Sequence, residues 1–141
     1  MNLTSREKEN LLHIVSKHLE RCNEILFAYI HGSFTGEGPF RDLDLAVFLS
    51  PGFLPQAGFR YEMQLESWIE ESIDRVVAVD VRILNTAPLR FRYHALRGRL
   101  VLDRDPDVRV SFTRHTVSRY LDIAPILKHH TREAFAIESG S

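Results

Sequence analysis

The stretch HGSFTGEGPFRDLDLAVFLS, residues 31–50, joins a glycine-rich turn to an apolar segment that carries two aspartates. Gly32-Ser33 opens the turn, and Asp42 and Asp44 stand where the apolar segment begins. The segment predicts a strand over 43–49, and successive side chains of a strand point to opposite faces. The two carboxylates therefore share one face and the leucines between them share the other. Burying charge at a strand is costly unless something compensates it, so the stretch indicates a site as well as a turn.

The rest of the chain alternates between helical and strand patterns. Helices are predicted over about 5–22, 60–74, 88–97 and 106–137, and strands over 25–31, 43–49, 76–84 and 99–103. Thr4 and Glu7 form a capping-box pattern at the first helix, and Pro125 must kink or divide the last one. The order αββαβαβα predicts an α+β fold, in which helices cover a small mixed α/β sheet.

Length and composition point to a single soluble domain. The chain has 141 residues, of which 44% are hydrophobic and 26% charged, and a domain of this size can bury a core without staples. We expect one domain over 1–141, with a core over about 5–104 and a helical stretch over about 106–137. No apolar run approaches the roughly 20 residues of a membrane span.

Two further features indicate a reducing compartment. The first residues, MNLTSREKENLL, lack the apolar core of a signal peptide. The single cysteine, Cys22, excludes an internal disulfide bond and offers no metal cluster. We therefore expect a cytoplasmic protein.

Charge is distributed unevenly along the chain. Residues 1–81 contain 13 acidic and 7 basic side chains, whereas residues 82–132 contain 4 acidic and 11 basic ones, most of them arginines. Any single arginine is more often solvated than functional, but the group could receive an acidic partner or a polyanion. No basic run is interleaved with aromatic residues, so direct nucleic-acid binding is not expected.

A third aspartate completes a pattern with the first two. Asp80 interrupts the apolar strand over 76–84 and faces away from its valines. If this strand lies beside the strand over 43–49, Asp80 joins Asp42 and Asp44 on one side of the sheet. Clustered carboxylates repel one another and raise one another's pKa, and Mg²⁺, which prefers hard oxygen ligands, would resolve that conflict. Two such ions can clamp the attacking and leaving oxygens of a phosphoryl transfer.

Gly32-Ser33 fits the same chemistry, although each feature alone has a simpler explanation. Glycine lets the backbone approach a ligand closely, and Ser33 offers a hydroxyl and an N–H group to a phosphate. A lone Gly-Ser is usually only a turn, and a lone Asp-x-Asp at a strand start is usually solvated. His31, which precedes the pair, is expected to pack at a strand end. The occurrence of Gly-Ser and all three aspartates at compatible positions of predicted strands favours a metal- and phosphate-binding site.

These motifs together resemble the DNA polymerase beta-like nucleotidyltransferase superfamily. Its signature is Gly-Ser, a short loop, Asp-x-Asp on a strand and a third aspartate on a later strand. The segments Val79–Pro88 and Arg97–Leu102 resemble the minimal nucleotidyltransferase (MNT) branch. The resemblance covers residues 25–104 and implies a nucleotidyltransferase fold.

The resemblance also implies roles for the residues that match. Asp42, Asp44 and Asp80 correspond to the metal-binding and catalytic carboxylates, for Mg²⁺ and usually two ions. Gly32 and Ser33 correspond to the pair that contacts the phosphates of the nucleotide.

Many members of the MNT branch are antitoxins paired with a HEPN-domain ribonuclease toxin. The resemblance implies transfer of AMP from ATP to a tyrosine of the toxin. Two alternatives stay open: a non-catalytic antitoxin that neutralises the toxin by binding, through the arginine-rich half and the helix over 106–137, or a nucleotidyltransferase that acts on a small molecule or an RNA end.

The turn itself departs from the commoner family pattern. Eight residues, 34–41, separate Gly-Ser from the first aspartate, where many members have about ten. Gly36, Gly38 and Pro39 leave little room for the short helix that usually follows Gly-Ser, which bears on how a nucleotide would lie.

Overall fold

The computed structural model describes residues 3–36, 40–54 and 58–135, and its elements follow the predicted order. The helices are α1 (Ser5–Glu20), α2 (Phe59–Ser72), α3 (Leu89–Ala95) and α4 (Pro106–Phe135), and the strands are β1 (Ile25–His31), β2 (Asp42–Leu49), β3 (Ala78–Ile83) and β4 (Arg99–Asp103). No helix in these ranges is both long enough and apolar enough to cross a membrane.

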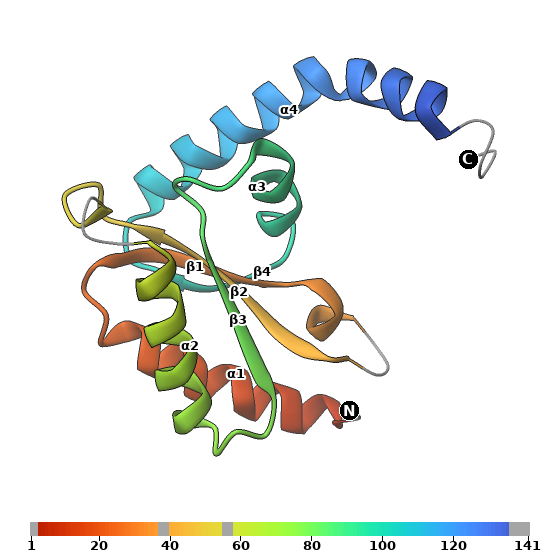
Figure 1. Cartoon of the computed structure of the whole chain (residues 1–141). Helices are drawn as coiled ribbons and strands as arrows, with labels where there is room; N and C mark the ends of the chain where they lie inside the picture. The colour runs from red at the N-terminus through yellow and green to blue at the C-terminus, as the bar shows by residue number, and fades with distance from the viewer. Residues whose placement is uncertain (1–2, 37–39, 55–57, 136–141) are drawn as a thin grey trace.

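The four strands form one mixed sheet in the order β3-β2-β1-β4 (Figure 1). β1 runs antiparallel to β2 and to β4, whereas β2 and β3 are parallel. The hairpin between β1 and β2 is made by the glycine-rich turn, and the parallel connection from β2 to β3 is made through α2. This arrangement confirms the mixed sheet flanked by helices.

Each face of the sheet has its own apolar core. Leu43, Leu45 and Val47 of β2 join residues of α1 and α2 on one face, and Ala46 and Phe48 join residues of α3 and α4 on the other. The two pairs of helices accordingly lie on opposite sides of the sheet in Figure 1. The aspartates of β2 belong to the α3–α4 face, at the end of the strand where Asp42 is exposed and Asp44 half-buried.

The first helix begins as the sequence predicted, and the last helix is not divided at its proline. Thr4 and Glu7 form the expected capping box: the Glu7 N–H donates to Thr4 Oγ1 at 3.1 Å and the Thr4 N–H to Glu7 Oε1 at 2.9 Å. α4 continues through Pro125 to Phe135 as one helix, drawn in Figure 1 as a single curved ribbon, so Pro125 does not divide it. Residues 136–137 of the predicted stretch lie outside the described residues.

The glycine-rich turn contains a short helix that the sequence did not predict. A 3₁₀ helix, η1 (Gly32–Thr35), directly follows β1. The expectation that Gly36 leaves little room for a helix was wrong, because the tighter 3₁₀ winding needs only four residues, and Gly36 itself follows as the capping residue. Gly38 and Pro39 lie outside the described residues.

The outer edge of β3 is sealed by carboxylates of α2. The N–H groups of Val79, Val81 and Ile83 donate to side-chain oxygens of α2, each at 2.9 Å. The acceptors are Glu70, Glu66 and Glu62 respectively. Four helical residues rise about 6 Å and two strand residues about 6.6 Å, so a glutamate at every fourth position meets every second N–H group. α2 thereby gives partners to an edge that would otherwise be open to pairing with other strands.

Replacing Glu66 tests this sealing of the edge. Glu66→Ala leaves the Val81 N–H without its charged acceptor, so we expect the free energy of unfolding, measured by urea denaturation, to fall by about 1–3 kcal/mol. Glu71→Ala on the same helix is the control, because Glu71 is exposed and its ion pair with Arg75 spans 3.9 Å, a contact worth about 0–1 kcal/mol. Equal losses in the two variants would contradict a structural role for Glu66.

Candidate functional site

Three polar side chains form a row across neighbouring strands of the sheet. His31 of β1 is the register partner of Asp44 of β2, and Asp44 is the register partner of Asp80 of β3. Adjacent strands lie about 4.8 Å apart, and register partners point to the same face of a sheet. The structure therefore brings Asp80 to the side of the sheet that carries the Asp-x-Asp pair, as the sequence predicted.

The charges in this row are only partly compensated. Burial raises the pKa of the Asp44 carboxyl above its ordinary value, and the nearby carboxylates of Asp80 and Asp42 raise it further. Arg82 opposes the increase; its Nε lies 4.0 Å from Asp80 Oδ1, and both side chains are about half exposed. The site therefore disfavours negative charge on Asp44 and would be stabilised by a cation.

Gly32 packs directly against one of these carboxylates. Its φ of +76° is in the left-handed region, and a Cβ added there would lie 2.3 Å from Asp44 Oδ2. The sequence suggested that this glycine lets a ligand approach the backbone; the structure shows that its absent side chain already makes room for Asp44. The Gly-Ser turn therefore packs directly against the Asp-x-Asp strand, through Gly32 and Asp44.

Ser33 lies next to this contact in an ordered turn. Its side chain is exposed, and its carbonyl accepts a hydrogen bond from the Gly36 N–H at 3.2 Å. The Thr35 hydroxyl donates to the Gly32 carbonyl at 2.8 Å. The turn that carries Ser33 is therefore held by its own hydrogen bonds and presents that side chain to solvent, where a phosphate could reach it.

His31 belongs to the site more closely than sequence reasoning indicated. Its ring packs edge-on against Phe91 with centroids 5.3 Å apart, which agrees with the expected packing at the strand end. Burial lowers the pKa of its imidazole, although Asp80 acts in the opposite direction, and its Nε2 is buried without a hydrogen-bond partner among the described residues. The sequence missed Phe91, which also lies under the Arg82 guanidinium at 5.6 Å, because nothing local links α3 to β1.

Carboxylate oxygens are ligands that a hard divalent cation prefers, but the side chains of these aspartates do not converge on a single point. Within the described ranges, no three His, Cys, Asp or Glu side chains converge closely enough to hold one ion. Asp42 and Asp80 are exposed, and burial, together with the neighbouring carboxylates, raises the pKa of Asp44. The donor set thus fits Mg²⁺, which takes a few carboxylates and keeps other positions for water or phosphate.

A pocket of about 360 Å³ adjoins the third carboxylate. Its lining includes Asp80 and Arg82 of β3, Glu62 and Glu66 of α2, and also Phe59 and Pro88. The pocket gives a molecule in solution access to Asp80 along the edge of the sheet.

The contact between Gly32 and Asp44 leads to a stability prediction. Gly32→Ala forces a side chain into a left-handed conformation and makes the Asp44 carboxylate turn aside, so we expect the free energy of unfolding to fall by about 1–2 kcal/mol. Gly52→Ala is the control, since a Cβ there meets no atom within 4 Å, and it should change stability by less than about 0.5 kcal/mol. Chemical denaturation of both variants measures the difference, and a Gly32→Ala protein as stable as Gly52→Ala would refute the packing described.

The fold agrees with structures of toxin–antitoxin complexes. A chain from the complex of tri-AMPylated Shewanella oneidensis HEPN toxin with an MNT antitoxin superposes with a TM-score of 0.63 at 14% identity, covering 92% of this chain and 99% of that one. A chain from a toxin–antitoxin structure with AMP-PNP gives 0.66 at 16% identity, over 92% and 98%. A chain from an MntA–HepT complex gives 0.61 at 13% identity, over 98% and 100%. At these identities the likeness concerns the fold.

Sequence comparison gives the family. No curated protein matches the chain significantly. The family model described as "Polymerase beta, Nucleotidyltransferase" matches residues 11–107, a range that contains the Gly-Ser turn, both aspartates of β2 and Asp80. The chain therefore belongs to the polymerase beta nucleotidyltransferase family.

Proposed function

We propose that this protein is an antitoxin that transfers AMP from ATP, with Mg²⁺, to a tyrosine of a partner HEPN-domain toxin and so neutralises it. The observation that carries the proposal is the row of Asp44 and Asp80 on adjacent parallel strands, with Gly32 packed against Asp44, in a chain of this family. The similar structures support the acceptor and the donor, because one contains a tri-AMPylated HEPN toxin and another contains AMP-PNP.

In this proposal the three aspartates hold the metal and the turn holds the phosphates. Asp42, Asp44 and Asp80 would supply the carboxylate oxygens for Mg²⁺, two ions in the family scheme. The bound ions would neutralise the phosphate charge that otherwise repels an attacking oxygen. Ser33 would donate its hydroxyl and N–H group to the phosphates at the place where Gly32 brings the backbone next to Asp44.

The acceptor would enter beside Asp80. The tyrosine oxygen attacks the α-phosphorus of ATP, the bond from that phosphorus to the bridging oxygen breaks, and pyrophosphate leaves. The tyrosine proton would pass to the Asp80 carboxylate, which is about half exposed and lines the adjoining pocket.

A second candidate is neutralisation by binding alone. It rests on α4, whose far half extends beyond the sheet in Figure 1 and on the excess of basic residues in the second half of the chain. A variant with Asp42, Asp44 and Asp80 all replaced by alanine separates the two functions. If that variant neutralises the toxin fully without ATP, binding suffices and transfer is not the mechanism.

The transfer itself is tested by intact mass spectrometry of the HEPN protein after incubation with this protein, Mg²⁺ and each nucleoside triphosphate. We expect a mass increase of one or more AMP units with ATP. Asp44→Ala should slow the transfer by at least about 100-fold, because even groups that only orient metal ligands matter 10–100-fold.

The control for loss of fold is Asp107→Ala, which removes an exposed aspartate at the start of α4, beyond the end of β4 that pairs with Phe27 rather than with the His31 end of β1. Wild-type transfer by Asp44→Ala would refute the mechanism. Modification of a small molecule or an RNA end in the absence of any protein partner would point instead to the third alternative.

Metal binding has a separate test in thermal unfolding. In a chelator at neutral pH, Asp44→Asn should raise Tm by a few degrees at most, because it removes a repelled charge in a site that solvent partly screens. The folded-state pKa of Asp44 is raised, so its charge opposes folding at neutral pH, and the advantage of asparagine should vanish as the pH falls below the ordinary aspartate pKa. Mg²⁺ should then raise the Tm of the wild type more than that of Asp44→Asn, and equal effects would argue against a metal at Asp44.

A further inference from the structure

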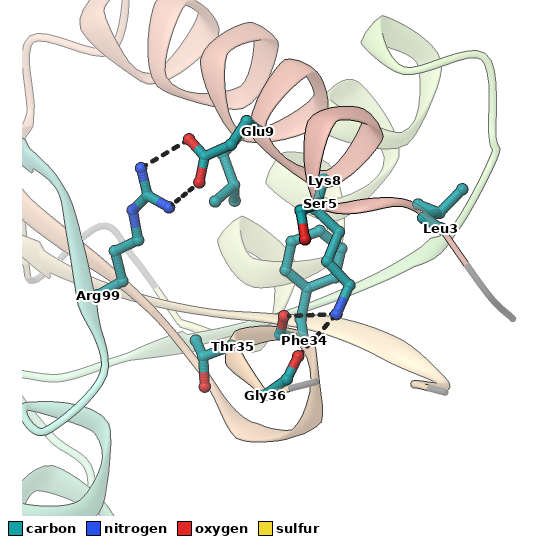
Figure 2. Close-up of a pocket in the computed structure, with 9 residues that line it drawn as sticks. Leu3, Ser5, Lys8, Glu9, Phe34, Thr35, Gly36 and Arg99 are labelled. Carbon is teal, nitrogen blue, oxygen red and sulfur yellow. Dashed lines mark hydrogen bonds and ion pairs between the residues drawn. The ribbon is translucent and has the colours of Figure 1, made fainter. Parts of the chain in front are cut away.

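A lysine on the first helix reaches across to the Gly-Ser turn. Figure 2 shows the Lys8 side chain extending from α1 to η1. Its Nζ donates a hydrogen bond to the Gly36 carbonyl at 2.8 Å and lies 3.3 Å from the Phe34 carbonyl, which also accepts from it. These carbonyls lie at the end of η1, where the last carbonyls of a helical turn have no partners of their own, and a cation is favourable at such a terminus.

Two aromatic rings fix the same ammonium group. Nζ lies 4.9 Å from the centroid of Phe40 and 5.3 Å from that of Phe34, within the range of a cation–π interaction. The two rings pack edge-on with centroids 4.6 Å apart, and both side chains are almost fully buried. Phe34 belongs to η1 and Phe40 lies two residues before the start of β2, so Lys8 contacts both sides of the turn.

α1 provides a rigid base for this contact. Its capping box lies at Thr4 and Glu7, next to Lys8, and its stripe of Leu11, Leu12, Val15 and Leu19 is buried on the sheet. The neighbouring cation of this region, Arg99, is engaged by both carboxylate oxygens of Glu9. Lys8 therefore adds charged hydrogen bonds between α1 and the turn, beside the packing of Phe34 in the core that includes the α1 leucines.

We propose that Lys8 is a positioning residue, which holds the Gly-Ser turn in place so that Ser33 can bind the phosphates of the nucleotide. The inference rests on the proposed nucleotidyltransferase function. The aromatic rings that Lys8 contacts belong to the core on the α1–α2 face of the sheet. Asp44 points to the opposite face, which it shares with Ala46 and Phe48. Lys8 therefore affects the site through the position of the turn and not by contact with the carboxylates.

Direct contact of Lys8 with a ligand is the competing explanation. A pocket of about 430 Å³ is lined by Lys8, Ser5, Phe34, Thr35 and Arg99, as Figure 2 shows. The two explanations make different predictions for the protein without nucleotide. A positioning residue restrains the turn before any nucleotide binds, whereas a residue that only contacts the ligand does not.

The test compares three variants of the full chain. Lys8→Met removes the charge and the donors but keeps the length of the side chain, and Lys8→Arg restores both charge and donors. Lys17→Met is the matched control, because Lys17 lies on the same helix and its 3.8 Å ion pair with Glu20 is exposed. The measurements are hydrogen exchange of the amides of residues 33–36 without nucleotide, the Kd for AMP-PNP, and KM and kcat for ATP with the partner toxin.

We expect Lys8→Met to exchange these amides faster and to bind AMP-PNP about ten-fold more weakly, the scale of one lost charge-assisted hydrogen bond. KM for ATP should rise more than kcat falls, Lys8→Arg should recover most of the affinity, and Lys17→Met should behave as the wild type.

Two results would overturn the inference while leaving the proposed function intact. One is a Lys8→Met protein with wild-type affinity for AMP-PNP. The other is weaker affinity with unchanged amide exchange, which would mean that Lys8 contacts the ligand itself. A wild-type protein that binds no AMP-PNP would instead overturn the proposed function, and the inference with it.

Discussion

The contact between Gly32 and the Asp44 carboxylate is the constraint on which the candidate site depends. Glycine takes the left-handed conformation at position 32 without strain and leaves room for Asp44 Oδ2, which an added Cβ would displace. That contact lies where His31 pairs with Asp44 in the register of β1 and β2, and the parallel register of β2 and β3 places Asp80 beside Asp44. The backbone thus brings the phosphate-binding candidates and the carboxylates to one end of the sheet, although the carboxylate side chains do not converge on one point.

The rest of the fold supports this arrangement from two sides. On the α1–α2 side, α2 seals the outer edge of β3 with a ladder of glutamates, so the strand that carries Asp80 is held by hydrogen bonds along both edges. On the other side, Phe91 of α3 packs against His31 and under Arg82. The repulsion among the carboxylates is left only partly compensated, and such a perturbed group in an accessible position is typical of a functional site.

Family membership and fold similarity carry different weight in the functional argument. The family match covers the turn and all three aspartates, so nucleotidyl transfer is supported by the residues themselves. The likeness to toxin–antitoxin structures extends over nearly the whole chain, but at 13–16% identity it concerns the backbone. The identity of the acceptor is therefore a matter for experiment on the partner.

The sequence by itself determined the order of the elements, the capping box at Thr4 and the alternation that separates Asp42 and Asp44 from the buried leucines, because these depend on local periodicity and spacing. It also predicted that Asp80 would join them, on the condition that the strands be neighbours. Only the tertiary structure showed that the strands carrying Asp44 and Asp80 are neighbours. It also revealed the 3₁₀ helix η1, the packing of Gly32 against Asp44, and the contacts of Lys8 and Phe91. Most of these features bring together residues that are far apart in the chain, through side-chain packing and strand register. Patterns of neighbouring residues in the sequence cannot predict such contacts.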